Sequence, residues 1–194
     1  MVQKFELTPL DLQGAYLISP FVATDERGGF VKDYSAELFA QHDMPYDLKE
    51  VFYTISHKGV IRAMHFQRVK QQAKLVRCIS GKVFDVIVDL RKESDTFLQW
   101  RGFYLSGDNF QQLLVPEGFG HGYLVLEDSV VAYKCAEKFY GEYDDGIQWD
   151  DKEMGIEWPL DEIGAPMIIS EKDKQLQSLN TFLANYDQFW SSEK

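Results

Sequence analysis

Five polar residues of this 194-residue chain have types and surroundings that suit chemistry. Arg62, His65 and Lys74 lie close together on what read as neighbouring extended segments, among apolar and aromatic residues that would exclude water. His121 and Tyr133 lie on later segments of the same kind. A histidine and a lysine held in such surroundings suit an anionic or enolising partner.

Three kinds of chemistry use residues of these types. A divalent metal site would use imidazoles and a carboxylate, but neither His65 nor His121 has a second histidine one residue away with a following glutamate. Nucleophilic catalysis needs a serine or cysteine beside a base, and neither cysteine lies in an electropositive, exposed-looking stretch. Proton abstraction next to a carbonyl needs a base, a cation at the developing oxyanion and an acid, which His65, Lys74 and Tyr133 supply. Composition alone does not choose among the three.

The overall charge and the cysteines limit the partners and the compartment. A net charge of -11 argues against binding of nucleic acid, which takes clustered lysine and arginine, but a small phosphorylated ligand needs only a few local cations. Cys78 and Cys135 lie in apolar runs without a CxxC motif, which predicts free buried thiols. With no secretory pattern and no run long enough to span a membrane, we expect a cytoplasmic protein without a membrane partner.

Strands must position these residues. From Val60 to Cys135, short runs rich in Val, Ile, Leu, Phe and Tyr alternate with turn signals, which predicts an antiparallel sandwich or barrel rather than βαβ units. In the run 83–90, one face is wholly apolar, whereas Asp85 and Asp89 interrupt the other. A mixed face of this kind suits a barrel lumen or a subunit contact.

Helices are expected only at the flanks of one domain that spans residues 1–194, with its core at about 25–173. Ser35 can cap a short helix over 35–41. Apolar residues at helical spacing predict a C-terminal helical tail over about 174–190. Between Asp25 and Phe30, paired glycines predict a turn that holds Arg27 on a bend.

Several blocks of the sequence, in order, carry a resemblance to a known family. They are Arg62-Ala63-Met64-His65-Phe66-Gln67, Gln72-Ala73-Lys74-Leu75-Val76-Arg77, Gly81-Lys82-Val83-Phe84-Asp85-Val86, Val88-Asp89-Leu90-Arg91, Pro116-Glu117-Gly118-Phe119-Gly120-His121-Gly122, Tyr133-Lys134 and Ile156-Glu157-Trp158-Pro159. Together they resemble the signatures of the dTDP-4-dehydrorhamnose 3,5-epimerase family, over about Asp25 to Asp173.

The resemblance implies a fold, an activity and an assembly. The implied fold is all-β, a cupin-like jelly-roll β-barrel with short flanking helices and a C-terminal helix. The implied substrate is a nucleotide diphosphate 4-keto-6-deoxy sugar, which such enzymes epimerise at the carbons flanking the ketone without a metal or organic cofactor. The implied assembly is a homodimer in which an N-terminal segment completes the partner's site.

The resemblance also implies catalytic roles for four residues. His65 matches the family's proton acceptor, and Asp173 matches the carboxylate that pairs with it, which would fix the imidazole tautomer and stabilise its cation. Tyr133 matches the proton donor on the other face of the sugar ring. Lys74 would stabilise the enolate at O4.

Further matches are substrate contacts, and several of them depart from the family pattern. Arg62, His121 and Lys172 match binding positions, and Arg27 matches a pyrophosphate contact that the planar guanidinium suits. The departures are Phe52 where the family has a ligand-binding Asn, Glu50 for Gln, Lys32 for Glu, Phe139 for the Tyr that stacks on the nucleobase, Asp144 for Glu, and Ala63-Met64 for Gly-Leu.

Most of these departures fall on ligand contacts and none on the implied acid, base and oxyanion residues. We therefore expect the proton chemistry to be retained while the sugar, the nucleotide or the number of epimerised carbons differs, because a missing polar partner changes recognition strongly. One alternative is an epimerase of C3 or C5 alone. The other is a non-catalytic protein that binds a sugar nucleotide on the same barrel.

Overall fold

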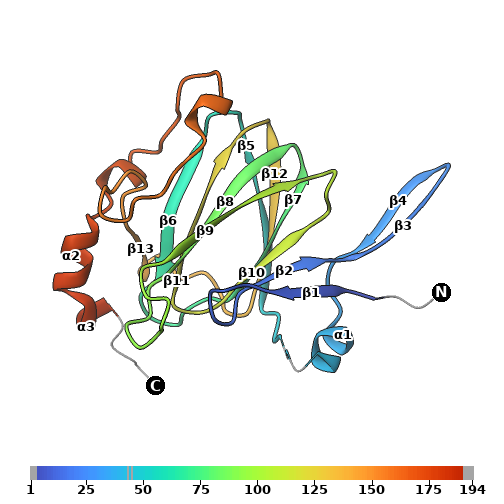
Figure 1. Ribbon diagram of the computed structural model, residues 1–194, viewed down its shortest axis with the longest axis horizontal. Coiled ribbons are helices and arrows are strands. Elements are labelled where there is room, and N and C mark those ends of the chain that lie inside the picture. Colours follow the sequence, from blue (N-terminus) through green and yellow to red (C-terminus); the bar gives the residue numbers. More distant parts are fainter. Residues whose placement is uncertain (1–3, 43, 45, 190–194) are drawn as a thin grey trace.

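The body of the protein is a sandwich of two antiparallel sheets (Figure 1), seen in a computed structural model that describes residues 4–42, 44 and 46–189. In spatial order, the six-stranded sheet consists of β1 (Glu6–Pro9), β2 (Tyr16–Ser19), β10 (Gln112–Val115), β7 (Lys74–Ser80), β12 (Ser129–Cys135) and β5 (Glu50–Ser56). The five-stranded sheet consists of β13 (Asp144–Gly146), β6 (Ile61–Gln67), β11 (Phe119–Val125), β8 (Lys82–Asp89) and β9 (Trp100–Ser106). The predicted all-β architecture is confirmed.

Strand β8 shows how the alternating pattern builds the layers. Its apolar face, with Phe84, Val86 and Val88, is buried in a core cluster that also contains Trp158 and Phe182 from the C-terminal part of the chain. Its mixed face turns the other way, where Val83 and Ile87 belong to the cluster between the sheets. Asp85 lies on this face with no exposed surface. The mixed face is therefore the barrel lumen, one of the two expectations for it.

The flanking helices are short. In α1 (Ala36–Gln41), the Leu38 amide donates to the Ser35 hydroxyl at 3.5 Å, so the predicted cap is confirmed. The C-terminal tail is helical but divided into the 3₁₀ turn η2 (Asp173–Gln175), α2 (Leu179–Ala184) and α3 (Tyr186–Phe189). The division occurs because Ser178 is extended and caps a new helix, accepting from Thr181. Residue 190, the last of the predicted tail, lies outside the described residues. Another 3₁₀ turn, η1 (Leu160–Glu162), precedes this tail.

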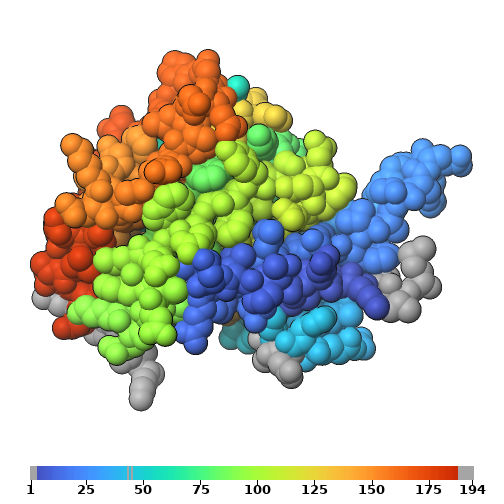
Figure 2. All heavy atoms as spheres, viewed as in Figure 1, coloured from blue at the N-terminus to red at the C-terminus, as the bar shows by residue number. Residues whose placement is uncertain are grey.

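A hairpin of β3 (Phe21–Asp25) and β4 (Gly28–Lys32) projects from the body as an arm (Figures 1 and 2). The two strands form a sheet of their own, and Arg27 lies in the predicted turn, before Gly28 with φ of +120°. At the base of the arm, the Asp33 carboxylate accepts from Lys134 Nζ at 2.8 Å and from the Arg77 guanidinium at 3.2 Å. A two-stranded hairpin is marginally stable by itself, so the arm is suited to being covered by another surface.

Several predictions concern the chain as a whole. Cys78 and Cys135 are free and buried, as predicted. Within the part of the chain that the structure describes, no helix is long and apolar enough to cross a membrane. In the same residues, no three or more His, Cys, Asp or Glu side chains are grouped so that they could hold a metal ion.

Candidate active site

A cavity of about 310 Å³ lies between the two sheets. All four residues with implied catalytic roles line it, so they do not point into separate compartments. Of the candidate site residues, those that line the cavity are His65, Tyr133, Asp173, Lys74, Phe52, Arg62, His121, Phe139, Asp144 and Lys172.

Strand register explains why these side chains converge. His65 on β6 lies directly opposite His121 on β11, so both imidazoles project from the same face of the five-stranded sheet. Tyr133 on β12 lies opposite Phe52 on β5, and Lys74 on β7 lies opposite Cys135, two residues beyond Tyr133. Alternation therefore places Tyr133 and Lys74 on the same inner face of the six-stranded sheet. The cavity thus has the two histidines on one wall and the phenol and ammonium on the other.

The first histidine pair lies at the edge of the cavity. His65 Nε2 is 3.2 Å from Asp173 Oδ2, and the two side chains are 23% and 8% exposed. The backbone amide of Asp173 donates to the Ser170 hydroxyl, which fixes the first residue of η2. Burial raises the pKa of Asp173, but the hydrogen bond and charge of His65, with Ser170, outweigh it and hold the pKa below its usual value. Asp173 is therefore an ionised partner for an imidazole that solvent and ligand can reach.

The second histidine pair is sealed. His121 Nε2 lies 2.9 and 3.0 Å from the two carboxylate oxygens of Asp85, and these side chains are 4% and 0% exposed. Burial raises the pKa of Asp85, against the opposing influence of His121 and Lys74. Asp85 was not among the predicted site residues, although its position on the mixed face of β8 was a signal for it.

The phenol and the ammonium on the opposite wall have shifted pKa values. Burial raises the pKa of Tyr133 well above its usual value, and the neighbouring Tyr123 phenol and the Asp85 charge raise it further. Burial lowers the pKa of Lys74, although the charges of Cys135, Asp144 and Asp85 oppose this. Tyr133 is therefore held in its protonated form, as an acid must be, and Lys74 loses its proton more readily than a solvated lysine does.

The rim of the cavity combines an aromatic ring with charged groups. Phe139 is 52% exposed, and its amide donates to the Glu50 carboxylate at 2.8 Å. Glu50 itself is absent from the cavity lining and holds the Phe139 segment through this hydrogen bond. Lys172 and Asp144 form an ion pair across the rim. These groups could bind a planar base and anionic groups.

Two predicted contacts lie away from this cavity, on the arm. Arg27 is at the tip, where its Nε and a terminal nitrogen donate to Asp25 at 3.1 and 2.5 Å, and its side chain is 86% exposed. Lys32 is on β4, opposite Phe21 in the hairpin register. Neither residue lines the cavity of its own chain.

Several lining residues were missed by sequence reasoning, namely Thr54, Phe66, Gln67, Gln72 and Ser170. Thr54 follows Phe52 by two residues and so shares its face, and its hydroxyl is 2.8 Å from the Tyr123 hydroxyl. Gln67 and Gln72 donate to the backbone carbonyls of residues 138 and 137. They therefore hold the segment that carries Phe139. Alternation was a signal for Thr54, whereas the glutamine contacts depend on the tertiary fold.

The chain is similar to known epimerases in sequence and in fold. A family model described as dTDP-4-dehydrorhamnose 3,5-epimerase matches residues 9–181. The dTDP-4-dehydrorhamnose 3,5-epimerase of Methanothermobacter thermautotrophicus is 45% identical over 91% of this chain and 95% of its own. The solved epimerase RmlC of Legionella pneumophila, in complex with dTDP-4-keto-L-rhamnose, is 34% identical with a TM-score of 0.86, over 91% and 93% of the two chains. ChmJ, a 3'-monoepimerase of Streptomyces bikiniensis in complex with dTDP-quinovose, is 26% identical with a TM-score of 0.85, over 95% of each chain.

Proposed function

Because this chain belongs to the dTDP-4-dehydrorhamnose 3,5-epimerase family, we propose that it is an isomerase that inverts the carbons flanking the ketone of a dTDP-linked 4-keto-6-deoxyhexose. One observation carries the proposal. A histidine with an ionised carboxylate partner lies on one wall of a single cavity, and a protonated phenol and a lysine lie on the other. This is the arrangement that proton removal and return on opposite faces of a sugar ring requires.

The proposed reaction begins at the carbon next to the ketone. His65 takes the proton of that carbon, and the electrons of the broken C–H bond form an enolate. The Lys74 ammonium stabilises the enolate oxygen, and Tyr133 then gives its proton to the opposite face of the carbon. Water removes the proton from His65 and restores the one lost by Tyr133, so each turnover leaves the proton balance unchanged. Asp173 orients the imidazole and stabilises its cation.

Local charge explains how a protein of net charge -11 would hold an anionic ligand. Arg62 and Lys172 are cations in the cavity lining, and His121 faces the same space. Phe139 supplies an exposed ring at the rim for the nucleobase. We assign Phe139 to the base, Lys172 with its partner Asp144 to the nucleotide, and Arg62 with His121 to the sugar-phosphate end.

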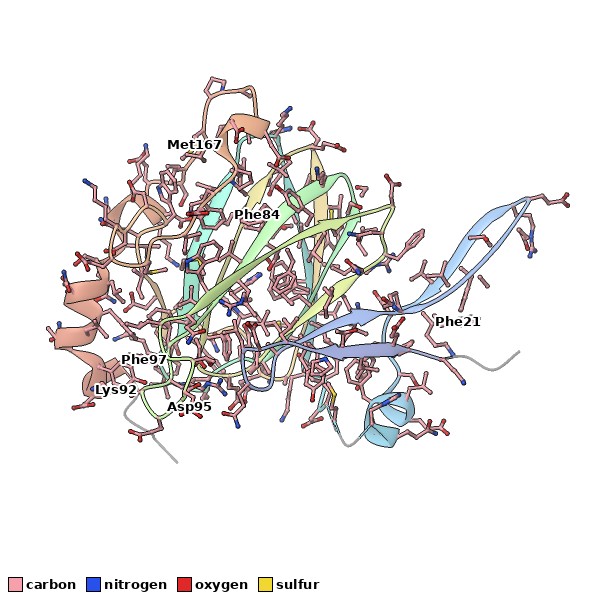
Figure 3. All side chains as sticks on the ribbon, viewed as in Figure 1. Phe21, Phe84, Lys92, Asp95, Phe97 and Met167 are labelled. Atoms are coloured by element: carbon pink, nitrogen blue, oxygen red, sulfur yellow. The ribbon has the colours of Figure 1, made fainter. Side chains whose placement is uncertain are left out.

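The arm and the outer face of β5 support a homodimer as the working assembly. Phe30 on the arm is 56% exposed and packs edge-on against Phe21, labelled at the base of the arm in Figure 3. The outward residues Val51, Tyr53 and Ile55 of the edge strand β5 are 60%, 66% and 70% exposed. An apolar stripe on an open sheet edge is typical of a surface that another chain covers. We propose that the arm of each protomer reaches the partner's cavity and brings Arg27, with Lys32 behind it, to the pyrophosphate.

Mixed dimers test the arm directly. Arg27→Ala protomers should lose about tenfold to a hundredfold in kcat/KM, the value of charge-assisted hydrogen bonds to a phosphate, and His65→Ala protomers should be inactive. If the arm acts on the partner, co-expressing the two variants with different tags gives mixed dimers in which one site has both an intact His65 and an intact Arg27. Those dimers should regain wild-type kcat/KM at that site. Mixed dimers no more active than the Arg27→Ala homodimer would show that the arm does not act across the dimer.

Deuterium incorporation tests the reaction and counts the carbons. With the dTDP-linked 4-keto-6-deoxyglucose as substrate in D₂O, two labels on the ring identify a 3,5-epimerase and one label identifies a single-centre enzyme. The likeness to a 3'-monoepimerase and the apolar Phe52 in the cavity make the single-centre reading the second candidate. Binding of dTDP without any exchange at either carbon, where a known family enzyme exchanges, would leave only a sugar-nucleotide binding protein.

The cysteines support a cytoplasmic location for this activity. Cys78 and Cys135 are free and buried rather than bridged. Free thiols are typical of a reducing compartment, where disulfides rarely persist. Fractionation of the source cells with an antibody to the chain would test this location, and recovery in the extracellular fraction would contradict it.

A further inference from the structure

The Tyr133 ring is held by aromatic neighbours. Phe52 stacks on its face, with the ring centroids 4.8 Å apart and the planes 14° from parallel. His121, from the other sheet, meets the same ring nearly edge-on, with a centroid distance of 5.9 Å and an interplanar angle of 76°. Offset-stacked and edge-to-face contacts are the two favoured geometries for aromatic pairs. Together they limit the angle that the phenol can adopt.

The Phe52 ring lies where it can restrict the orientation of the Tyr133 ring within the cavity. The two residues are direct cross-strand partners of β5 and β12, so their side chains project from the same face of the sheet. Phe52 is half-buried and lines the cavity, whereas its neighbours Val51 and Tyr53 point outward. Its side chain has no hydrogen-bonding group. Phe52 therefore cannot pair with a polar group of a substrate, but it presents a flat surface to the phenol.

The position of the phenol decides the stereochemical outcome of each proton removal. Once His65 has taken a proton, two events compete for the enolate. Return of a proton from His65 restores the original configuration, and delivery from Tyr133 inverts it. Because proton transfer needs the donor within hydrogen-bond reach and in line, a small rotation of Tyr133 slows delivery without affecting the first step.

We propose that Phe52 is a positioning residue for Tyr133, whose stacked ring holds the phenol where it delivers its proton to the carbon face opposite His65. In doing so, Phe52 sets the ratio of inversion to return with retention. This inference rests on the proposed function, in which Tyr133 is the acid. Where the family pattern has an Asn that contacts the ligand, Phe52 acts instead through another side chain, that of Tyr133.

The test compares exchange with inversion in Phe52→Leu, which keeps an apolar side chain but removes the flat ring. In D₂O, label incorporation measures proton removal by His65, which can exchange its proton with solvent because its side chain is 23% exposed. The NMR spectrum of the product measures inversion. We expect label incorporation and KM close to wild type, and inversion slower by about threefold to tenfold, the value of one aromatic stack.

Two further variants isolate the role of the ring. Phe52→Tyr keeps the stack and should restore the wild-type ratio of inversion to exchange. Phe97 lies on a loop beside the C-terminal helices (Figure 3) and meets Tyr186 of α3 edge-on. Phe97→Leu removes this different aromatic contact and should leave both rates unchanged. Should Phe52→Leu fail to fold, Phe52→Met gives the same comparison.

Each of the other outcomes would contradict a different part of the account. A raised KM with an unchanged ratio in Phe52→Leu would show that Phe52 contacts the substrate and does not position Tyr133. Unchanged KM, exchange and inversion would show that the stack has no role in the reaction. Failure of the proposed function is recognised separately, because then the wild-type protein itself neither incorporates label nor inverts the sugar.

Discussion

The cavity contains two histidine–carboxylate pairs that differ in access to solvent. His65 and Asp173 lie where a ligand can reach the imidazole, and the pKa of Asp173 is lowered mainly because the hydrogen bond and charge of His65 outweigh burial. His121 and Asp85 are almost completely enclosed, and burial raises the pKa of Asp85. The two imidazoles are nevertheless direct neighbours in register on β6 and β11.

The same two residue types therefore perform different tasks according to their burial. A reachable imidazole with an ionised partner can take a proton from a ligand and release it to water. An enclosed pair exchanges protons with solvent poorly, but it fixes the orientation of the imidazole that meets Tyr133 edge-on. We therefore assign proton removal to the His65 pair. To the His121 pair we assign the architecture of the cavity floor, where His121 also makes the sugar contact proposed above.

His65→Leu should cause the greatest loss of activity. Loss of a general base of this kind lowers kcat/KM by about a thousandfold. Stability should fall by only about 1 kcal/mol, because Asp173 keeps its contact with Ser170 and remains close to water. Steady-state kinetics and thermal unfolding of the same preparation check both parts. A thousandfold loss of activity together with a large loss of stability would assign His65 a structural role.

The matched change at the second pair, His121→Leu, should act mainly on stability. It leaves the enclosed Asp85 without its partner, which costs about 3 kcal/mol. For a chain of this length, that corresponds to a Tm lower by about 6–12 °C, measured at equal protein concentration. A Tm within a degree of wild type would contradict the assignment of this pair to the cavity floor.

The smallest effect concerns the alkaline limb of the pH profile. Because burial lowers the pKa of Lys74, its ammonium is lost as pH rises through a value below that of a solvated lysine. Tyr133 stays protonated there, since its pKa is raised. The kcat/KM of the wild type should therefore fall with rising pH, and Lys74→Arg, which keeps its charge, should lack this limb. The same limb in both proteins would trace it to another group.

Much of the fold was predictable because its signals are local. Alternating apolar residues and turn signals between Val60 and Cys135 indicated antiparallel sheets, and Ser35 indicated the start of α1. The break in the C-terminal tail was harder to predict, because apolar spacing continues across it. There Ser178 starts α2 and Asn185 ends it, each through contacts with the backbone. Spacing alone does not reveal which polar residue becomes a cap.

The catalytic candidates were predictable because they match positions of a known family. His65, Lys74, Tyr133 and Asp173 do meet in one cavity. The partnership of Asp85 with His121 was not predictable, because it depends on how β8 lies beside β11. The placement of Arg27 outside its own cavity depends on the direction in which the hairpin leaves the barrel, which no local pattern encodes.

Deuterium exchange in two single variants tests whether His65 removes the proton and Tyr133 delivers the new one. In D₂O, Tyr133→Phe should incorporate label at a carbon flanking the ketone while forming little inverted product, because His65 still removes the proton. His65→Leu should incorporate no label at either carbon. Label incorporation by His65→Leu at the wild-type rate would contradict the assignment of proton removal to the His65 pair.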